Sequence, residues 1–417
     1  MGSRPLISLC LVLAPLGPAL SMSASVPDSE GHLELQARTN IVDGFNLPPF
    51  SSYNSMTPSL ADSGQVAVSV SVVGGDTSTV GVFLGSKGVG GLVWTDGGDS
   101  FISDCSLNGS GLAVWRLSDA SPDGLYYYDD SDGSSGLLTT RPLGASYWTG
   151  IEVNASGQVG FRASFLGDYA WVSYDGETNP PFHAVDEGID VSPYWYLYTP
   201  SFNDSRLIAG KVSLAADHSH DQIVACTEDA VCTVLVEDRD ADPSSDFTSF
   251  GNSVSLTNSG WVAFRAGLDG GEDGVFLTDG TTTVTIATTA MPEVSGIDAF
   301  APSANDSGQV AFRAFDGAGL QAVFVGDGTD LVKVVTEHDL VPSDLGTARV
   351  DQHDDSVVFA GSPSINSSGD VAFIASLTPP DDNQVEWGSG LFIAYRGVLF
   401  ADGFESGDTS GWSSAVP

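Results

Sequence analysis

One four-residue phrase recurs seven times along the chain, and this repetition limits the folds that the chain can adopt. The phrase is Asn-x-Ser-Gly followed by an apolar stretch, and successive copies lie about 50 residues apart. Its fourth position holds Gly64, Gly111, Gly157, Arg206, Gly260, Gly308 and Gly369. Its first position holds Asn108, Asn154, Asn203, Asn305 and Asn366, with Ala61 and Thr257 in the two other copies. The chain is therefore a tandem array of seven similar units.

The phrase has the chemistry of a tight turn between two strands. An Asn side chain bonds the backbone two residues further on, and a Gly in fourth place accepts a positive φ without a Cβ clash. Strand-like runs follow directly, such as Val262–Ala266 and Val310–Ala314. A second run comes about ten residues later, as in Gly274–Leu277 and Ala322–Val325. Each phrase thus predicts a hairpin corner that joins two strands.

Asp-Gly pairs predict a further turn within several units. They occur at Asp175-Gly176, Asp279-Gly280 and Asp327-Gly328, and this dipeptide is the signal of a type I′ hairpin. A last strand follows the pair, as in Thr282–Ala287 and Leu331–Val335. Each unit therefore predicts four antiparallel strands.

Seven such units predict an all-β protein, a seven-bladed β-propeller formed by residues 26–400 as a single domain. Radial closure leaves only short, protected strand edges. A β-solenoid or a pair of sandwiches is the alternative architecture. Residues 32–39 alternate apolar and polar side chains, so we expect this segment to pair as the outer strand of the last blade. In the alternative closure, Val398–Phe400 completes that blade locally.

The two ends of the chain carry targeting patterns. Arg4 precedes an apolar run from Leu6 to Leu20 and then small residues, so residues 1–25 are predicted to be a secretory signal peptide. No later stretch has the length or hydrophobicity of a membrane span. Residues 401–417 form a short C-terminal tail, interpreted either as a sorting motif or as a frayed terminus. The expected location is extracellular, at the cell surface or in the periplasm.

The charge balance excludes two classes of partner. The chain has 54 acidic and 14 basic residues, a formal net charge of −40. This charge repels a phosphate backbone and an anionic membrane, and the basic stripe of a nucleic-acid binder is missing. Hydrophobic residues make up 41% of the chain, which is enough for a core.

Two of the four cysteines are spaced for a disulfide. Cys226 and Cys232 flank a five-residue turn between two apolar runs, so a bridge across a hairpin is predicted. Two free buried thiols are the alternative. Cys105 is then the odd thiol, expected to be a small core residue.

A repeated cation is the sharpest local signal in this acidic chain. Five residues after the fourth position of the phrase come Ser69, Arg116, Arg162, Lys211, Arg265, Arg313 and Ile374. In one interpretation each cation lies between neighbouring blades and pairs with an Asp or with backbone carbonyls. In the other, these cations line the central channel and bind an anionic ligand, such as a uronic acid or a sulfated glycan.

One acidic loop is a candidate calcium site. Asp238, Asp240, Asp242 and Asp246 offer alternating carboxylates, although Pro243 replaces the Gly of a typical calcium loop. A solvated acidic loop is the alternative. Apart from calcium, no cofactor is indicated.

The repeats resemble a known family. The sequence Asn-x-x-Gly-x-x-Ala-Phe occurs at Asn305–Phe312 and Asn366–Phe373, with Gly for Ala at Asn154–Phe161. It resembles the secreted bacterial family of tandem NxxGxxAF-repeat, choice-of-anchor proteins. The resemblance implies export and surface association, and implies no activity.

The sequence favours an exported, non-enzymatic interaction or surface module that binds an extracellular glycan or another exported protein. Tyr126–Tyr128 and Tyr194–Tyr196 are candidates for stacking on sugar rings, or for packing between blades. The alternative function is a glycan-active hydrolase or lyase on a propeller scaffold. No nucleophile elbow, His-Glu-x-x-His motif or P-loop is present, so we name no catalytic residue.

Overall fold

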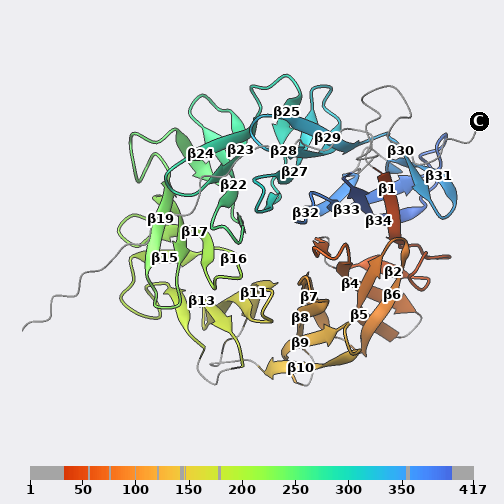
Figure 1. Ribbon diagram of the computed structural model, residues 1–417, viewed down its shortest axis with the longest axis horizontal. Coiled ribbons are helices and arrows are strands. Elements are labelled where there is room, and N and C mark those ends of the chain that lie inside the picture. The colour runs from red at the N-terminus through yellow and green to blue at the C-terminus, as the bar shows by residue number, and fades with distance from the viewer. Residues whose placement is uncertain are drawn as a thin grey trace, which may run out of the picture.

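Seven antiparallel sheets surround a central opening in the computed structural model (Figure 1). The structure describes residues 32–396 except 55–56, 75–76, 99, 120–121, 141–144, 146, 177–179 and 354–356. The predicted all-β, seven-bladed propeller is confirmed. The predicted signal peptide, the tail at 401–417 and the Val398–Phe400 segment lie outside the described residues.

The strands follow the same order in each blade, from the central opening outward. The innermost position holds β2 (Ser51–Tyr53) with β3 (Ser59–Leu60), β7 (Phe101–Leu107), β11 (Tyr147–Val153), β15 (Tyr194–Leu197) with β16 (Ser201–Phe202), β20 (Phe247–Phe250) with β21 (Ser255–Leu256), β25 (Val294–Ile297) with β26 (Ser303–Ala304), and β32 (Phe359–Ile365). The second position holds β4 (Val66–Gly74), β8 (Leu112–Ser118), β12 (Val159–Phe165), β17 (Ile208–Leu214), β22 (Val262–Leu268), β27 (Val310–Asp316) and β33 (Val371–Thr378).

The two outer positions complete each blade. The third position holds β5 (Thr77–Ser86), β9 (Gly124–Asp129), β13 (Asp168–Tyr174), β18 (Asp221–Cys226), β23 (Asp273–Thr278), β28 (Gln321–Gly326) and β34 (Gly388–Tyr395). The outermost position holds β6 (Val89–Gly97), β10 (Ser134–Thr140), β14 (Phe182–Val185), β19 (Cys232–Glu237), β24 (Thr283–Thr288), β29 (Leu331–Thr336) and, in the last blade, β1 (His32–Arg38). A hairpin of β30 (Leu340–Ser343) and β31 (Gly346–Val350) extends the last sheet.

The repeated phrase forms the turn between the innermost and second strands, as predicted. In the third blade, Asn154 Oδ1 accepts the amides of Ser156 and Gln158 at 3.1 and 2.9 Å. All six glycines at the fourth position have φ between 79° and 89°. Arg206 takes the same conformation with φ 61°, which is unfavourable for a residue with a Cβ. Its guanidinium forms ion pairs with Asp175 at 3.1 Å and with Glu228, and these contacts offset the backbone cost.

The Asp-Gly turns are present, but the predicted type I′ geometry is wrong for Asp279-Gly280, the turn between β23 and β24. Thr278 pairs with Thr283, so four residues form the loop. Of its Asp-Gly pair only Gly280 has a positive φ, 83°, whereas a type I′ turn needs two. Asp279 Oδ1 instead accepts the amides of Thr281 and Thr282, and this side-chain bonding selects the longer turn.

Phenylalanine pairs fill the spaces between neighbouring sheets. Cross-strand partners stack in three blades, with ring centroids 5.5 to 5.7 Å apart: Phe264–Phe276, Phe312–Phe324 and Phe373–Phe392. In the fourth blade Gly210 takes the place of the first Phe of such a pair. A Cβ there would lie 2.6 Å from the Trp171 ring of the third blade, so the neighbouring indole fills that space.

The fourth blade contains the predicted disulfide. Cys226 and Cys232 are opposite each other on β18 and β19 and are bonded. Cys105 is a free cysteine, buried in the core between the first two blades as expected. A disulfide is typical of proteins in oxidising compartments. It is therefore consistent with export.

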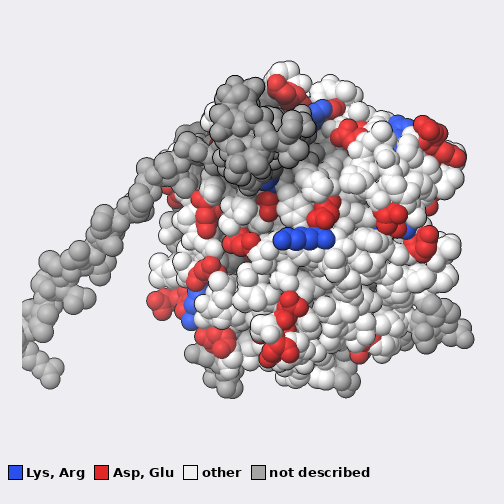
Figure 2. Space-filling model, turned by 45° about the vertical axis from the view of Figure 1, so that its right-hand side comes forward, with Lys and Arg blue, Asp and Glu red and all other residues white. Residues whose placement is uncertain are grey.

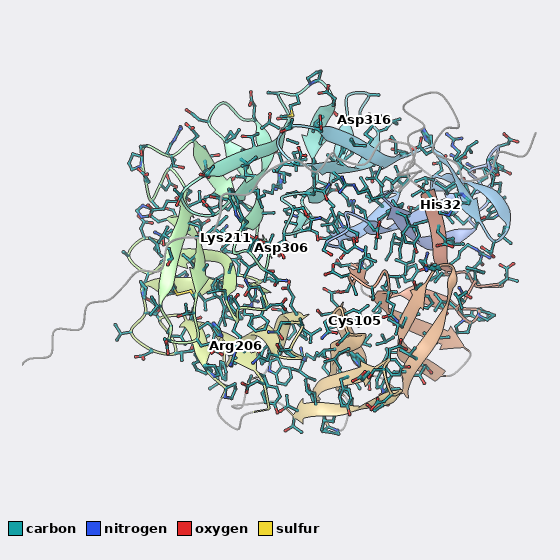
Figure 3. The ribbon with its side chains drawn as sticks, viewed as in Figure 1. His32, Cys105, Arg206, Lys211, Asp306 and Asp316 are labelled. Atoms are coloured by element: carbon teal, nitrogen blue, oxygen red, sulfur yellow. A yellow bond between two sulfur atoms is a disulfide. The ribbon has the colours of Figure 1, made fainter. Side chains whose placement is uncertain are left out.

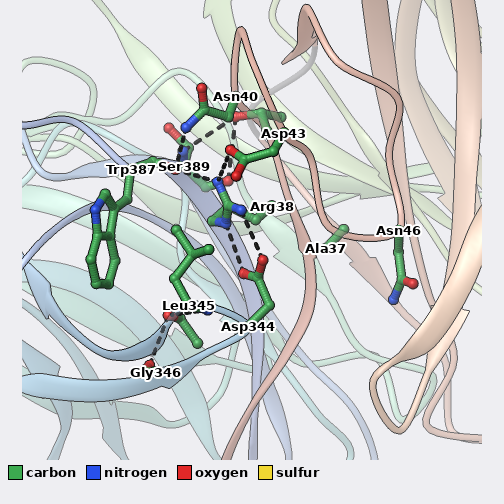
Figure 4. A network of polar contacts seen from close by, with 12 residues as sticks. Ala37, Arg38, Asn40, Asp43, Asn46, Asp344, Leu345, Gly346, Trp387 and Ser389 are labelled. Carbon is green, nitrogen blue, oxygen red and sulfur yellow. Dashed lines mark hydrogen bonds and ion pairs between the residues drawn. The ribbon is translucent and has the colours of Figure 1, made fainter.

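The ring closes through the N-terminal strand. β1 pairs antiparallel with β34, as predicted, and Figure 1 shows this red strand beside the blue strands of the last blade. Arg38, fully buried at the end of β1, forms a two-point ion pair with Asp344 at 2.7 and 2.8 Å (Figure 4). It also donates to the Trp387 carbonyl at 2.7 Å. One guanidinium therefore joins the first strand to the β30–β31 hairpin and to the segment before β34.

We expect Asp344→Ala to lower the free energy of unfolding by about 3 kcal/mol, because it leaves a buried guanidinium with the exposed and more distant Asp43, at 3.7 Å, as its carboxylate partner. Urea denaturation measures the change. The matched control is Asp269→Ala, which removes the partner of Arg239 in a pair with 36% and 66% exposed side chains. A control as destabilising as Asp344→Ala would contradict the special role of the Arg38 contact.

Candidate functional site

The repeated cations lie at the interfaces between blades. Each of four donates to a backbone carbonyl on the innermost strand of the next blade. These bonds are Arg116 to Trp148 at 3.5 Å, Arg162 to Leu197 at 2.8 Å, Lys211 to Phe250 at 3.3 Å, and Arg313 to Gly361 at 2.9 Å. Ser69, at the same position in the first blade, donates its hydroxyl to the Ser103 carbonyl at 2.5 Å. In the first blade the position therefore bridges neighbouring blades without a cation, whereas Ile374 of the last blade has no polar atom for such a bond.

Carboxylates and aromatic rings complete the surroundings of these cations. Ion pairs join Lys211 to Asp221 at 2.8 Å, Arg313 to Asp298 at 2.6 Å, Arg265 to Asp273 at 3.3 Å and Arg116 to Asp123 at 3.6 Å. Arg162 lies over the Tyr169 ring at 4.3 Å, Lys211 over Tyr198 at 4.3 Å and Arg313 over Phe300 at 4.2 Å. Figure 3 marks Lys211 within its blade. These are the contacts of the inter-blade interpretation, and anion binding by this set stays a prediction.

The four aspartates of the calcium hypothesis do not gather around one point. Asp238 is buried, and its carboxylate accepts the amides of Asp221 at 3.1 Å and Ala241 at 2.9 Å. Asp242 Oδ1 accepts the amide and hydroxyl of Ser244 at 2.9 and 2.8 Å. Asp240 and Asp246 are exposed. Among described residues, the group with three ligand atoms within 4.8 Å of one another lies elsewhere, at Glu337, His338 and Asp351. Calcium at the Asp238 loop stays a prediction.

Asp238 has a structural counterpart in other blades, which explains its burial. Asp186 accepts the Tyr169 amide at 2.6 Å, and Glu337 accepts the Gln321 amide at 3.1 Å. Each residue directly follows an outermost strand and accepts an amide at the start of the third strand, from its first residue (Asp221, Gln321) or its second (Tyr169). This position therefore fastens the outer edge of the blade.

The central channel, about 440 Å³, is surrounded by a complete circle of side-chain-to-backbone hydrogen bonds. One residue of each innermost strand accepts an amide from the next blade. Written as backbone amide to side-chain oxygen, the bonds join Leu107 to Ser59, Val153 to Ser106, Phe202 to Glu152, Leu256 to Ser201, Ala304 to Ser255, Ile365 to Ser303 and Leu60 to Ser364, at 2.7 to 3.2 Å. The circle holds the inner ends of all seven blades together.

Glu152 is the one acidic member of this circle. Its side chain keeps some exposure to the channel but lies deep inside the ring, and burial raises the pKa of its carboxyl from 4.5 to about 7. Hydrogen bonds from the Phe202 amide and the Ser201 hydroxyl, at 2.7 and 2.9 Å, act in the opposite direction. Aligning the seven units by sequence would single out Glu152, because the six other units have Ser at the same position.

A pocket of about 530 Å³ lies between the third and fourth blades, and we call it the aromatic pocket. Its lining comes from the turn after β12, the start of β13, the connection from β14 to β15, and β15 itself. The lining residues are Gly167, Asp168, Tyr169, Asp186, Glu187, Gly188, Val191, Ser192, Trp195 and Tyr196. The pocket therefore combines aromatic rings with carboxylates.

Trp195 is 44% exposed, and a stacking contact orients its indole ring. His218 stacks on it with ring centroids 3.9 Å apart and an angle of 10°. Tyr169 and Tyr196 meet edge to face at 5.0 Å, and Arg162 lies over the Tyr196 ring at 5.5 Å.

The carboxylates of the aromatic pocket come from residues that sequence patterns did not single out. Asp186 is buried, and this burial raises the pKa of its carboxyl. The nearby Asp168 carboxylate raises that pKa further. Trp195 and Tyr196 were candidates from the sequence, whereas Tyr194 beside them is buried. Asp168 and Asp186 reach the same pocket because β13 and β14 are paired, and no spacing in the sequence indicates this.

The sequence of residues 145–399 matches a family of unknown function, DUF7453. The chain belongs to this family. The matched part of this DUF7453 protein runs from the third blade to the end of the last, and includes the aromatic pocket. A comparison with curated proteins found no match.

Solved propellers share the fold of the DUF7453 protein at low identity. An oligogalacturonate lyase in complex with manganese has TM-score 0.51 and 11% identity, over 87% of this chain and 96% of that one. The β-propeller domain of the Trilobed protease from Pyrococcus furiosus has TM-score 0.50 and 9% identity, over 82% and 93%. TolB from Acinetobacter baumannii has TM-score 0.42 and 14% identity; 61% of this chain matches, and the match spans 59% of TolB. At these identities the likeness to the lyase and to the protease domain shows the fold alone.

The charged side chains of the DUF7453 protein are mostly acidic. Figure 2 shows acidic side chains spread over one face, with fewer basic ones among them. Within the described residues, no helix is long and apolar enough to span a membrane.

We expect Arg313→Gln to lower the free energy of unfolding by about 2–3 kcal/mol, because it removes a 3% exposed cation from Asp298 and from the Gly361 carbonyl. Arg265→Gln is the control and costs less, since Arg265 is 27% exposed and pairs within its own blade. Urea denaturation with and without a uronic-acid oligomer measures both. Unchanged stability together with lost anion binding would instead favour the ligand-binding interpretation.

We expect Glu152→Ser to change how stability depends on pH. A carboxyl whose pKa is higher in the folded state holds its proton more tightly there, so the wild type loses stability as pH rises from 4.5 to about 7. Serine, as in the other six blades, keeps an acceptor for the Phe202 amide and removes this loss. The variant should gain about 1–2 kcal/mol over wild type at pH 8 and little at pH 4.5. Melting curves across this range decide, and an equal effect at both pH values would refute the assignment.

Proposed function

We propose that the protein is an exported, non-enzymatic propeller that binds an uncharged glycan chain in the aromatic pocket. The observation that carries the proposal is the exposed Trp195 ring, held by its stack on His218 at 3.9 Å beside a concave pocket with several carboxylates. Ligand pockets typically join apolar and aromatic surface to a few polar groups that fix orientation. A sugar ring offers an apolar face to the indole and hydroxyl donors to the carboxylates.

The charge of the pocket favours a neutral ligand. Asp168, Asp186 and Glu187 line it, and Arg162 beneath the tyrosines is bonded to the Leu197 carbonyl at 2.8 Å. A polyanion would meet these carboxylates and the net charge of −40. The name of the similar lyase refers to oligogalacturonate, a polyanion. We therefore expect this chain to prefer an uncharged oligosaccharide over that substrate.

Export is part of the proposal. It rests on the signal-peptide pattern at residues 1–25 and on the Cys226–Cys232 disulfide. The resemblance of the Asn-x-x-Gly-x-x-Ala-Phe repeats to secreted choice-of-anchor proteins supports attachment at the cell surface. An outward-facing glycan-binding module is consistent with both.

The test measures binding of neutral and uronic-acid oligosaccharides to the purified chain, first on a glycan array and then by calorimetry. We expect saturable binding to a neutral class and a loss of about tenfold or more in Trp195→Ala, because a central aromatic anchor carries much of such an interface. Phe101→Ala is the matched control, since Phe101 is 65% exposed and lies outside the pocket.

Three results would overturn this proposal. The first is an equal loss of glycan affinity in Trp195→Ala and Phe101→Ala. The second is tighter binding of oligogalacturonate than of neutral oligosaccharides, and the third is no binding to any glycan. Release of shortened sugars from a bound glycan would favour the hydrolase or lyase alternative over a binding module.

A further inference from the structure

A cluster of three metal-ligating side chains lies where the sixth blade passes into the β30–β31 hairpin. Glu337 and His338 follow β29, and Asp351 follows β31. His338 Nε2 is 3.7 Å from Glu337 Oε1 and 3.8 Å from Asp351 Oδ2. One ligand atom from each residue lies within 4.8 Å of the others. An ion between them would need only small side-chain movements.

The backbone holds the three residues in this arrangement. His338 donates its amide to the Val350 carbonyl at 2.7 Å, which ties the two ends of the hairpin together. Its φ is 75°, a conformation that non-glycine residues rarely adopt. Glu337 donates its amide to the Gln321 carbonyl at 2.8 Å, and its Oε2 accepts the Gln321 amide at 3.1 Å. Oε1 of Glu337 therefore remains on the His338 side.

Asp351 points an unsatisfied oxygen into the cluster. The residue is 4% exposed, and its Oδ1 accepts the Gln352 amide at 2.8 Å. Its Oδ2 is buried and has no hydrogen-bond donor among the described residues. Arg349 Nε lies 3.3 Å away and balances part of the charge without a hydrogen bond. Buried carboxylate oxygens are normally bonded or coordinate a metal, so this oxygen points to a missing partner.

We propose that Glu337 Oε1, His338 Nε2 and Asp351 Oδ2 form a binding site for a divalent transition-metal ion. One imidazole and two carboxylates suit Zn²⁺ in tetrahedral coordination and leave one position for water or a ligand atom. Calcium prefers oxygen ligands throughout, so His338 disfavours it. Arg349 is 30% exposed and competes with the ion for Asp351.

The test is calorimetric titration of Zn²⁺ into the full chain after treatment with chelator, in excess Mg²⁺ to occupy the acidic surface. We expect one zinc equivalent to bind and to raise the melting temperature. His338→Asn should weaken binding at least tenfold, and Asn tolerates the positive φ of this position, so the fold is retained. His220→Asn is the matched control, because within the described part of the chain His220 forms an ion pair with one carboxylate, Asp217 at 3.7 Å, and belongs to no three-ligand group.

A gain of affinity provides the second readout. Arg349→Gln removes the competing cation and should strengthen zinc binding severalfold, an effect that diffuse binding to an acidic surface would not produce. Absorption bands of bound Co²⁺ that disappear in His338→Asn would identify the imidazole ligand. Absence of zinc binding, or equal affinity in His338→Asn and wild type, overturns the proposal. Because the cluster lies in blades other than those of the aromatic pocket, neither result bears on glycan binding.

Discussion

The last blade of this propeller borrows its outer strand from the opposite end of the chain, and the ring depends on that pairing. Each sheet buries its faces against two neighbours, so an open ring would expose two apolar sheet faces at once. The pairing of β1 with β34 prevents this. Arg38 reinforces it, since its buried guanidinium reaches Asp344 and the Trp387 carbonyl from the end of β1. The β30–β31 hairpin, an addition to the regular blade, supplies that aspartate.

Side chains join the blades, because no strand among the described residues pairs with a strand of a neighbouring blade. Near the channel a serine hydroxyl, or the carboxylate of Glu152, accepts an amide from the following blade. At the turns, Asn side chains donate to the next turn in the ring, as from Asn108 to the Asn154 carbonyl at 2.9 Å. The second residue of the turn phrase adds a further bond, as where Asp306, beside the central opening, accepts the Ser259 amide of the preceding turn (Figure 3). Four of the repeated cations, Arg116, Arg162, Lys211 and Arg313, extend this pattern by donating to carbonyls of the next blade.

The candidate sites lie where the units differ from one another. Glu152 replaces a serine of the inner circle and places a carboxyl in the channel. The aromatic pocket depends on Trp195 and on the β14–β15 connection, which belong to one blade interface. The Glu337, His338 and Asp351 cluster depends on the β30–β31 hairpin, which among the described sheets is particular to the last. A repeated scaffold therefore supplies the frame, and single departures from the repeat supply the chemistry.

The sequence by itself determined the number of blades, the turn between the first two strands, the closing strand and the disulfide. The blades, the turn and the disulfide are local or periodic, since a positive φ at Gly64 or a hairpin between Cys226 and Cys232 needs only neighbouring residues. The closing strand pairs across the length of the chain, and only the alternation of apolar and polar residues at 32–39 indicated it. Tertiary structure alone decided which distant side chains meet. Asp344 lies 306 residues from Arg38, and Asp351 reaches His338 only through the register of β30 and β31. Such meetings follow from the pairing and packing of whole sheets, which residue spacing along one chain does not encode.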